Sequence, residues 1–341
     1  MKRRWKITLA GTGTAVVAAG LSVLLMVLPS GARPVAPKRA IPVSHPDAAA
    51  PAGQMQAALQ LMSPFTGEPV KALGPVVVVK IDNIVQARPP TGLTSADIVY
   101  LLPVEGGLSR IFAVFSTRFP TIIGPVRSAR EDDLELLRQF GRPAFAYSGA
   151  QPQLLPVVER ARIVDLYSGL VGGYFRDDRR IAPYNLYARG RQLLAEARGA
   201  STAHSIGFRF GPAPAGGRAT ASEAVSYAAA SFTFTWSASK GRWLVGMDGS
   251  RALSTDDGQL SAATVVIQYT IVRKSRFIEW GALPPYAEST GSGQAVVLRN
   301  GRAYQARWSR PSAGDGTTFR TLSGRPMTFA PGPVWIVLTA R

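Results

Sequence analysis

The sequence predicts an α+β protein in which a mixed α/β domain precedes a mostly antiparallel β domain. Its 341 residues suffice for two domains and a leader. Short apolar runs alternate with helical patterns up to about residue 208, whereas strand-like runs separated by Gly, Asp and Asn turns dominate from about residue 223. We therefore expect an α/β domain at 63–208, a connection at 209–222 and a β-rich domain at 223–341.

The first 32 residues have the features of a secretory signal or a membrane anchor. "MKRRWK" is basic, residues 7–32 carry no charge, and Ser30-Gly31-Ala32 fits a small-x-small cleavage site. The uncharged run is also about long enough to span a bilayer. Both interpretations place the following residues outside the cytoplasm, anchored to the membrane by this segment or secreted. The Pro- and Ala-rich residues 33–62 then serve as a linker.

The elements of the first domain are predicted from short apolar runs and their flanking turns. "VVVVKI" at 76–81 reads as a buried strand, and 97–116 as two strands broken at Glu105-Gly106-Gly107. After the helix that follows "IGPVR", the predicted series is a strand in 144–150, a short helix in 151–161, a strand or turn in 163–169, a polar loop at 174–187 and a helix in 188–200.

The helix after residue 127 raises a question of charge. Ser128 and Glu131 match the capping-box spacing, and Gly141 would end the helix. Yet Arg127 and Arg130 lie where the helix dipole disfavours cations. We expect an anionic partner there, either a carboxylate elsewhere in the fold or a ligand.

The second domain reads as a series of antiparallel strands. The predicted strands lie within 231–238, 242–248, 263–272, 294–310 and 333–340. Asn300-Gly301, between two apolar runs, is a strong signal for a two-residue hairpin turn.

Composition excludes several function classes. The formal net charge is +18, and residues 1–40 hold seven basic residues and no acid, which leaves +11 for the rest. This balance favours an anionic partner such as an envelope glycopolymer or a small anionic ligand; no nucleic-acid motif is present, so we expect no nucleic acid. Without cysteine, and with only two histidines, thiol chemistry, histidine triads and multi-histidine metal sites are disfavoured. We expect no cofactor and no metal.

Polar side chains at predicted strand ends and loops form the candidate site, because α/β folds build sites there. Arginine is frequent among them, and its planar fork suits carboxylate or phosphate. The candidate ligand-binding residues are Asp82, Asn83, Arg88, Glu105, Arg110, Arg127, Ser128, Arg130 and Asn185. Lys80, Asp97, Arg176, Asp177 and Arg179 belong to the same polar clusters.

Structural roles are open for the same residues. Glu105 could pair with Arg110 or Arg127 as an internal ion pair. Ser128 is first a helix cap, and Asp82 with Asn83 could simply end a strand.

Several segments resemble one known family, in the same order. "PFTGEPV", "VKIDNIVQARPPTGLTSADIVYLLPVEGGLSRIFAVF", "IGPVRSAR" and "APYNLY" resemble the YerB-like family of extracytoplasmic bacterial proteins described as lipoproteins, which carry a domain of unknown function. "WLVGMDG", "VVIQY", "GSGQAVVLRNG" and "FAPGPVWIVL" resemble its C-terminal domain, so the resemblance covers roughly 62–340.

The resemblance implies two extracytoplasmic domains but supplies no reaction. The site that it implies consists of Asp82, Asn83, Arg88, Glu105, Arg127, Arg130 and Asn185. Members often carry a lipid-anchoring cysteine, which this chain lacks, and often a histidine where this chain has Tyr184.

Three functions fit these residues. The first is a binding module for an anionic envelope ligand, glycopolymer or peptidoglycan-related, in an Arg-rich cleft. The second is a hydrolase or transferase acting on cell-wall polymers through Asp82, Asp97 or Glu105; a glycosidase needs two carboxyls about 5 to 9.5 Å apart. The third is an envelope scaffold that uses arginines of the hairpin at 294–310.

Overall fold

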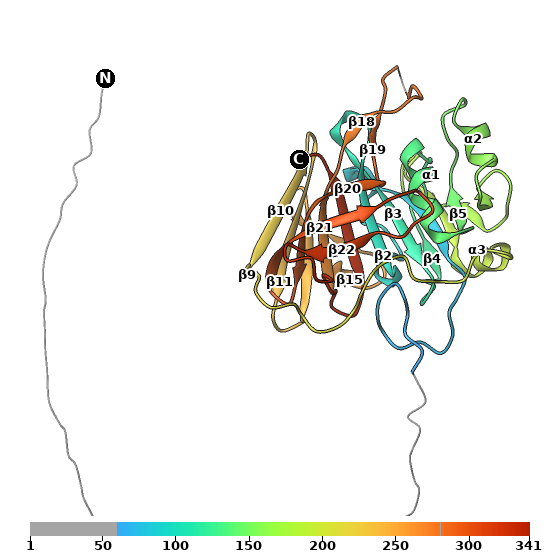
Figure 1. Cartoon of the computed structure of the whole chain (residues 1–341). Coiled ribbons are helices and arrows are strands. Elements are labelled where there is room, and N and C mark those ends of the chain that lie inside the picture. Colours follow the sequence, from blue (N-terminus) through green and yellow to red (C-terminus); the bar gives the residue numbers. More distant parts are fainter. Residues whose placement is uncertain (1–59, 280) are drawn as a thin grey trace, which may run out of the picture. The chain divides into compact units, whose positions relative to one another are not determined.

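The computed structural model describes residues 60–279 and 281–341 (Figure 1). The predicted leader at 1–32, and the predicted linker except its last residues, lie outside the described residues. In the part of the chain that is described, no helix is long and apolar enough to cross a membrane.

An 11-stranded mixed sheet forms the centre of the described chain, in the order β22-β21-β20-β17-β23-β2-β3-β1-β5-β6, with β9 beside β21. The first half supplies β1 (Val77–Asp82), β2 (Ile98–Pro103), β3 (Ser109–Phe115), β5 (Ala144–Tyr147) and β6 (Val164–Tyr167). The second half supplies β9 (Arg218–Ala219), β17 (Thr264–Tyr269), β20 (Gly291–Arg299), β21 (Arg302–Arg310), β22 (Thr318–Thr321) and β23 (Val334–Thr339). Strands from both predicted domains thus share one sheet, and the described residues belong to one compact unit.

The strand directions decide where loops from different strands meet. β5 and β6 are parallel to β1, and β23 and β17 are parallel to β2. Because β3 is antiparallel to both β1 and β2, all six of these strands end at the same edge of the sheet. β3 begins there, so the β2–β3 connection also lies at this edge, which we call the carboxyl edge.

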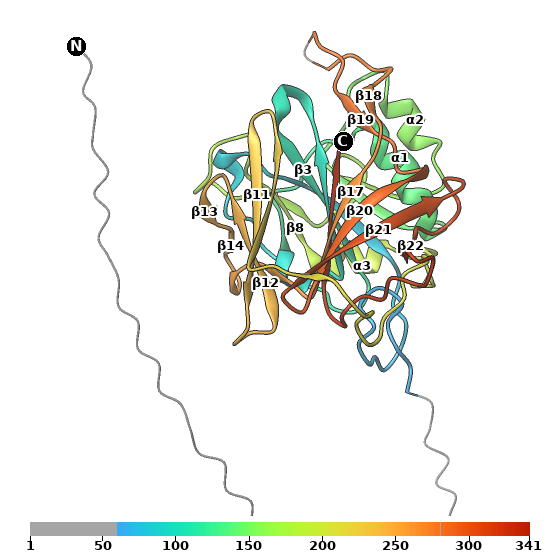
Figure 2. The ribbon, with the colours of Figure 1, turned by 60° about the vertical axis from the view of Figure 1, so that its left-hand side comes forward.

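Helices lie on one side of the central sheet and a second sheet on the other (Figure 2), and an apolar cluster fills each of the two interfaces. Because side chains alternate along a strand, Val76 and Val78 pack with α1 (Glu131–Leu137) and α2 (Leu155–Glu159). Val77 and Val79 share the other core with Phe232 and with the second sheet and α3 (Gly190–Glu196). The second sheet contains β10 (Ser222–Tyr227), β11 (Ala230–Ser237), β12 (Arg242–Met247), β13 (Ser250–Arg251) and β16 (Ser261–Ala262).

The remaining elements are short. A three-stranded sheet contains β4 (Ile122–Ile123), β8 (Leu186–Arg189) and β7 (Tyr174–Arg176), and β14 (Leu253–Ser254) pairs with β15 (Gly258–Gln259). β18 (Val272–Lys274) and β19 (Pro285–Ala287) form a hairpin at the top of Figure 1, far from residues 60–75 at the bottom. Short 3-10 turns lie at Val85–Ala87, Leu93–Ser95, Glu105–Gly107 and Arg138–Phe140.

Most predicted elements of the first half are present, with two corrections. The polar loop expected at 174–187 contains β7 and the start of β8, which pair antiparallel. The helix begins at Glu131 with Arg130 at its N-cap, so Ser128 is not the cap. Instead, the carboxylate of Asp133 accepts the backbone N–H of Arg130 at 2.7 Å.

The Asn300-Gly301 turn is confirmed. Arg299 pairs with Arg302 across it, and both turn residues have positive φ, 51° for Asn300 and 70° for Gly301. These are the angles that make this dipeptide favourable in a hairpin.

Candidate functional site

The predicted site residues gather at and around the carboxyl edge, but they form three separate groups. Asp82 ends β1, Glu105 lies in the β2–β3 connection and Arg110 is near the start of β3. Asp82 and Arg110 are direct partners in the β1–β3 ladder. The segment from Arg127 to Arg130, before α1, crosses the same edge, because the N–H of Arg127 donates to the carbonyl of Lys80.

The first group is an internal ion network around Glu105. The guanidinium of Arg130 grips Glu105 through two nitrogens, Nε at 3.0 Å from Oε2 and Nη2 on Oε1. Arg130 Nη2 also contacts Glu279 at 3.0 Å, and Arg110 Nη2 lies 3.3 Å from Glu105. Arg130 and Arg110 are therefore neutralised within the protein, which answers the charge question at the start of α1.

Electrostatics fix the protonation states of this network. Burial alone would raise the pKa of Glu105, but the hydrogen bond from Arg130 and the charges of Arg110 and Arg130 lower it to about 2. Burial and the neighbouring Arg130 lower the pKa of Arg110 to about 10. Glu105 is thus a permanent anion between two cations at neutral pH, unsuited to proton transfer.

Lys80 and Asp133 form a second ion pair beneath the network. Both side chains are completely buried, and Lys80 Nζ lies 2.5 Å from Asp133 Oδ1. Lys80 is therefore structural and cannot reach a ligand from solvent. Ser128 contributes its carbonyl, 3.3 Å from Arg110 Nη1.

The second group is more open and centres on Arg127. Its Nε lies 2.7 Å from Asp82 Oδ2, a charge contact without hydrogen-bond geometry. Its terminal nitrogens donate no hydrogen bond to any described residue, and its side chain is 22 % exposed. The guanidinium carbon lies 5.7 Å from the centre of the Tyr184 ring, within cation–π range. Arg127 therefore keeps free donors at the surface.

Arg176 extends this open group. Its side chain is exposed on β7, and its Nη1 donates to Asn185 Oδ1 at 2.7 Å. Asn185 itself is buried and follows Tyr184 directly, so its hydrogen bond ties Arg176 to the segment that carries Tyr184. Arg176 makes no ion pair with a carboxylate of the described residues, whereas exposed Arg179 pairs with Asp177. Arg127, Tyr184, Asn185 and Arg176 form what we call the Arg127 cluster.

The third group links the two halves of the chain. Asn83 receives Arg88 Nε at 3.2 Å on its side-chain oxygen and Nη2 at 2.7 Å on its backbone oxygen. Arg88 Nη1 lies 2.7 Å from Asp248 of the second half. The sequence therefore identified Arg88 as a binder of carboxylate, but the carboxylate is internal.

Asp97 does not join the other predicted acids. It precedes β2, whereas Glu105 follows it, so the strand separates them by about 20 Å, six residues at roughly 3.3 Å each. Asp97 Oδ2 accepts the backbone N–H groups of Ser116 and Thr117 at 2.6 and 2.8 Å. Asp97 and Glu105 are therefore too far apart to act as a glycosidase pair.

Sequence reasoning missed the acidic face of α1 as a docking surface for the β18–β19 hairpin. Glu131 accepts the N–H and Nε of Arg276 at 2.8 and 2.6 Å. Glu135 accepts the N–H groups of Ser289 and Thr290 at 2.7 and 3.0 Å. Four-residue spacing places both acids on one helix face. No local sequence pattern predicts their partners, which lie about 150 residues away.

Comparisons with known proteins agree with this architecture. Two family models match, "Protein of unknown function (DUF3048) N-terminal domain" over residues 65–203 and its C-terminal domain over 223–336. "Putative lipoprotein YerB" of Bacillus subtilis is 36% identical over 137 residues, which cover 38% of this chain and 40% of that protein. The alignment thus spans about two fifths of that relative's length.

A solved structure supports the fold independently. The crystal structure of the YerB protein from Bacillus subtilis matches with a TM-score of 0.69 at 21% identity, covering 83% of this chain and 97% of that chain. At this identity the match establishes the shared fold. Because the two family models together cover most of the chain in the expected order, the protein belongs to the DUF3048 family, that of YerB.

Proposed function

We propose that this protein is an extracytoplasmic binding protein that holds an anionic cell-envelope polymer at the Arg127 cluster. The observation that carries the proposal is the unused donor capacity of Arg127, whose terminal nitrogens make no hydrogen bond to the described chain. Elsewhere at the carboxyl edge the guanidinium groups of Arg110 and Arg130 are occupied by internal acids.

The chemistry of the Arg127 cluster suits a phosphate or carboxylate on a sugar-containing chain. Arg127 and Arg176 are two cations that both contact the Tyr184-Asn185 segment, and guanidinium binds such oxyanions through paired N–H donors. The Tyr184 ring beside Arg127 offers a flat apolar surface for a sugar ring. Two more exposed arginines, Arg189 at the end of β8 and Arg191 in α3, add positive charge that favours an anionic polymer.

The proposed location rests on the basic and apolar start of the sequence and on the relative's name. The B. subtilis relative is called a lipoprotein, and this chain begins with an uncharged segment at 7–32 after a basic stretch. We propose that this segment directs residues 33 onward outside the cytoplasm and either anchors them or is removed.

A hydrolytic function is less well supported. Asp82 lies against Arg127 and Glu105 against two arginines, whereas a general acid must be able to hold a proton. Glu105 is also the single acidic residue among the described residues that line the neighbouring pocket of about 400 Å³.

The test compares arginines in the full-length chain in mild detergent. Arg127→Ala and Arg176→Ala are measured against Arg209→Ala, an exposed arginine with no described side-chain bond near the opposite edge. The probes are purified teichoic acid, polygalacturonate and neutral dextran, with binding read by interferometry and stability by thermal unfolding. We expect at least tenfold weaker binding of one anionic polymer to each cluster variant, with Tm almost unchanged.

Two results would reject the proposal. If Arg209→Ala weakens binding as much as Arg127→Ala, the attraction is due to net charge alone. If all three variants bind every anionic polymer like the wild type, the Arg127 cluster is not the binding site.

A further inference from the structure

A shallow groove of about 580 Å³ lies on the outer face of the second sheet, the face turned away from the central sheet. Side chains alternate along β11 and β12, so Phe234 and Val245 are buried in the core whereas Thr233 and Leu244 lie on the outer face. Gly246 also lies on that face and is the direct ladder partner of Thr233. Because Gly246 has no side chain, it leaves the floor of the groove open.

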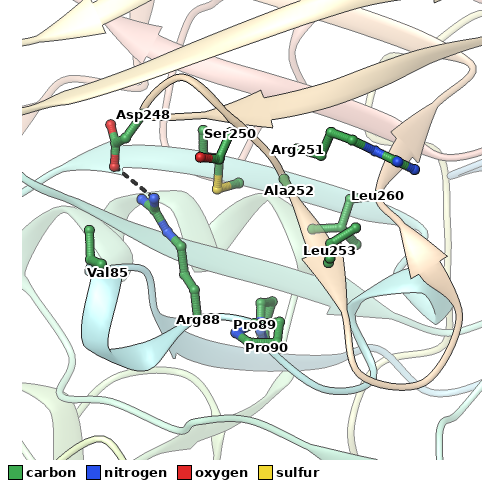
Figure 3. A pocket seen from close by; sticks show the side chains of 11 residues that line it. Val85, Arg88, Pro89, Pro90, Asp248, Ser250, Arg251, Ala252, Leu253 and Leu260 are labelled. Carbon is green, nitrogen blue, oxygen red and sulfur yellow. Dashed lines mark hydrogen bonds and ion pairs between the residues drawn. The ribbon is translucent and has the colours of Figure 1, made fainter.

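Two cations and no acid are among the described residues that line the groove. Arg251 is the ladder partner of Gly246 and so shares its face, where its Nε donates to the side-chain oxygen of Gln259 at 3.0 Å. Figure 3 shows the Arg251 side chain pointing away from Pro89-Pro90 of the neighbouring pocket. Lys240 is exposed in the β11–β12 turn. Neither cation makes an ion pair in the part of the chain that the structure describes.

The two cations lie at different points along β12. Lys240 precedes Arg242, the first residue of the strand, and Arg251 lies opposite Gly246, four residues further on. At roughly 3.3 Å per residue, the strand covers about 13 Å between these points. A ligand that reaches both cations must therefore be extended and must carry more than one anion along its length.

The floor between the cations favours a sugar chain over a peptide. Thr233 and Thr235 present hydroxyl groups, which both donate and accept hydrogen bonds as sugar hydroxyls do. Leu244 adds an apolar contact for the face of a sugar ring. β11 and β12 each pair with strands on both sides, so their backbone groups are already occupied. A peptide could not add itself here as a further strand, which requires a free sheet edge.

We propose that this groove binds an extended acidic oligosaccharide, with its carboxylates at Lys240 and Arg251 and its hydroxyls on Thr233 and Thr235. The charge of the groove is complementary to such a ligand. The groove shares no residue with the Arg127 cluster, so binding at either site can fail without the other.

Carbodiimide coupling on the full-length chain in mild detergent tests the groove through Lys240, because the Arg127 cluster contains no lysine. The probe is tetragalacturonate. The reagent activates its carboxylates, which then form an amide bond with a nearby lysine amine, and mass spectrometry locates the bond. Lys274, exposed on β18, is the matched reference, and coupling of acetate corrects for the reactivity of each lysine. We expect at least fivefold more corrected coupling at Lys240 than at Lys274.

Variants of the groove residues separate recognition from simple accessibility. Arg251→Ala should lower coupling at Lys240 at least fivefold, and Thr233→Val, which keeps the side-chain shape but removes the hydroxyl, at least twofold. Arg209→Ala, at an exposed arginine outside the groove, should couple like the wild type.

Three results would overturn the proposal. Equal corrected coupling at the two lysines would reject the groove as a binding site. An Arg251→Ala variant that couples like the wild type, or one that loses no more than Arg209→Ala, would reject the paired cations. If tetraglutamate couples at Lys240 as well as tetragalacturonate does, the groove does not select a sugar chain.

Discussion

Lys80 is a fully buried cation whose charge is met by the equally buried carboxylate of Asp133. Removing one partner of such a pair leaves an uncompensated charge in the interior, which typically costs about 3–5 kcal/mol. We therefore expect Lys80→Met, which keeps an unbranched side chain one atom shorter than lysine, to lower the free energy of unfolding by about that amount. Urea titration at pH 7 measures it.

The double variant Lys80→Met/Asp133→Asn separates charge from packing. Asparagine still accepts the N–H of Arg130 but carries no charge, so part of the lost stability should return. Lys240→Met, at an exposed lysine, serves as control and should change stability by less than about 0.5 kcal/mol. A loss of under 1 kcal/mol in Lys80→Met would show that the pair is not effectively buried.

Asp132 makes stability depend on pH near neutrality. Burial and the neighbouring Asp133 raise its pKa to about 7, whereas an unfolded aspartate titrates near 3.9. The folded state therefore binds more protons between these values, and stability is present below about pH 4 and lost as pH rises through about 7. Asp132→Asn mimics the protonated form and should flatten this slope between pH 5 and 8.

Urea midpoints at four pH values test the assignment. Asp257→Asn, at an exposed aspartate, should keep the wild-type slope. Asp97, whose pKa burial raises to about 6, remains in all three proteins and adds a common background. Parallel slopes in the wild type and Asp132→Asn would contradict the prediction.

At this scale, the sequence predicted that Arg127 and Arg130 needed anionic partners, and it was right. The dipole rule and the position of Ser128 sufficed for that. It could not say which acids, because Glu105 approaches Arg130 only once β2 and β3 are paired. Ser128 was assigned as the cap because a serine–glutamate spacing is a common signal, but Arg130 is the N-cap and Asp133 accepts its backbone N–H.

At the scale of elements, the β20–β21 hairpin depends on its turn. Gly301 has φ +70°, and an added Cβ would lie 2.9 Å from Trp236 Nε1. Gly249 has a similar φ, +76°, with open space around its Cβ position. Gly249→Ala should therefore cost about 1–2 kcal/mol for backbone strain alone, and Gly301→Ala more, because Trp236 must also move.

Chemical denaturation of the two alanine variants side by side measures the difference. Equal losses would show that Trp236 adapts without cost, and a stable Gly301→Ala would show that the turn tolerates another geometry.

Local signals decided which elements could be predicted. Val76 to Ile81 is a β-branched run interrupted only by Lys80, and Asn300-Gly301 fits one turn type, so both were found. The β7–β8 hairpin was missed because its strands are three and four residues long and the intervening loop holds two arginines and two aspartates. Its strands form because β8 also pairs with β4, and no local sequence pattern predicts that pairing.

At the scale of the molecule, the two halves should unfold together. β2 of the first half pairs with β23 of the second, so neither half has a complete sheet alone. We expect a fragment of residues 60–208 to lack a cooperative thermal transition, whereas residues 60–341 should show one. Circular dichroism during heating measures both.

A contrary result would be equally clear. If the 60–208 fragment melts cooperatively near the Tm of 60–341, the halves are independent domains that merely share a sheet edge. The boundaries predicted at 209–222 would then describe folding units as well as a connection.

At this scale, predictions from the sequence were limited by partners that are far apart along the chain. Glu279 and Asp248 lie 149 and 160 residues from Arg130 and Arg88, the arginines they neutralise. The sequence shows that these two acids are present, but it does not show which arginines they contact. The Arg-rich cleft was therefore expected to be open, and only Arg127 and Arg176 retain that character.

β23 lies between β17 and β2, near the middle of the sheet, although it is the last strand of this sheet in chain order. During synthesis, β2 and β17 are therefore made before the strand that joins them. Until then β2 and β17 each have an unsatisfied edge, at which another chain could pair. A premature stop before Val334 would remove the strand that joins the two halves in the interior of the sheet.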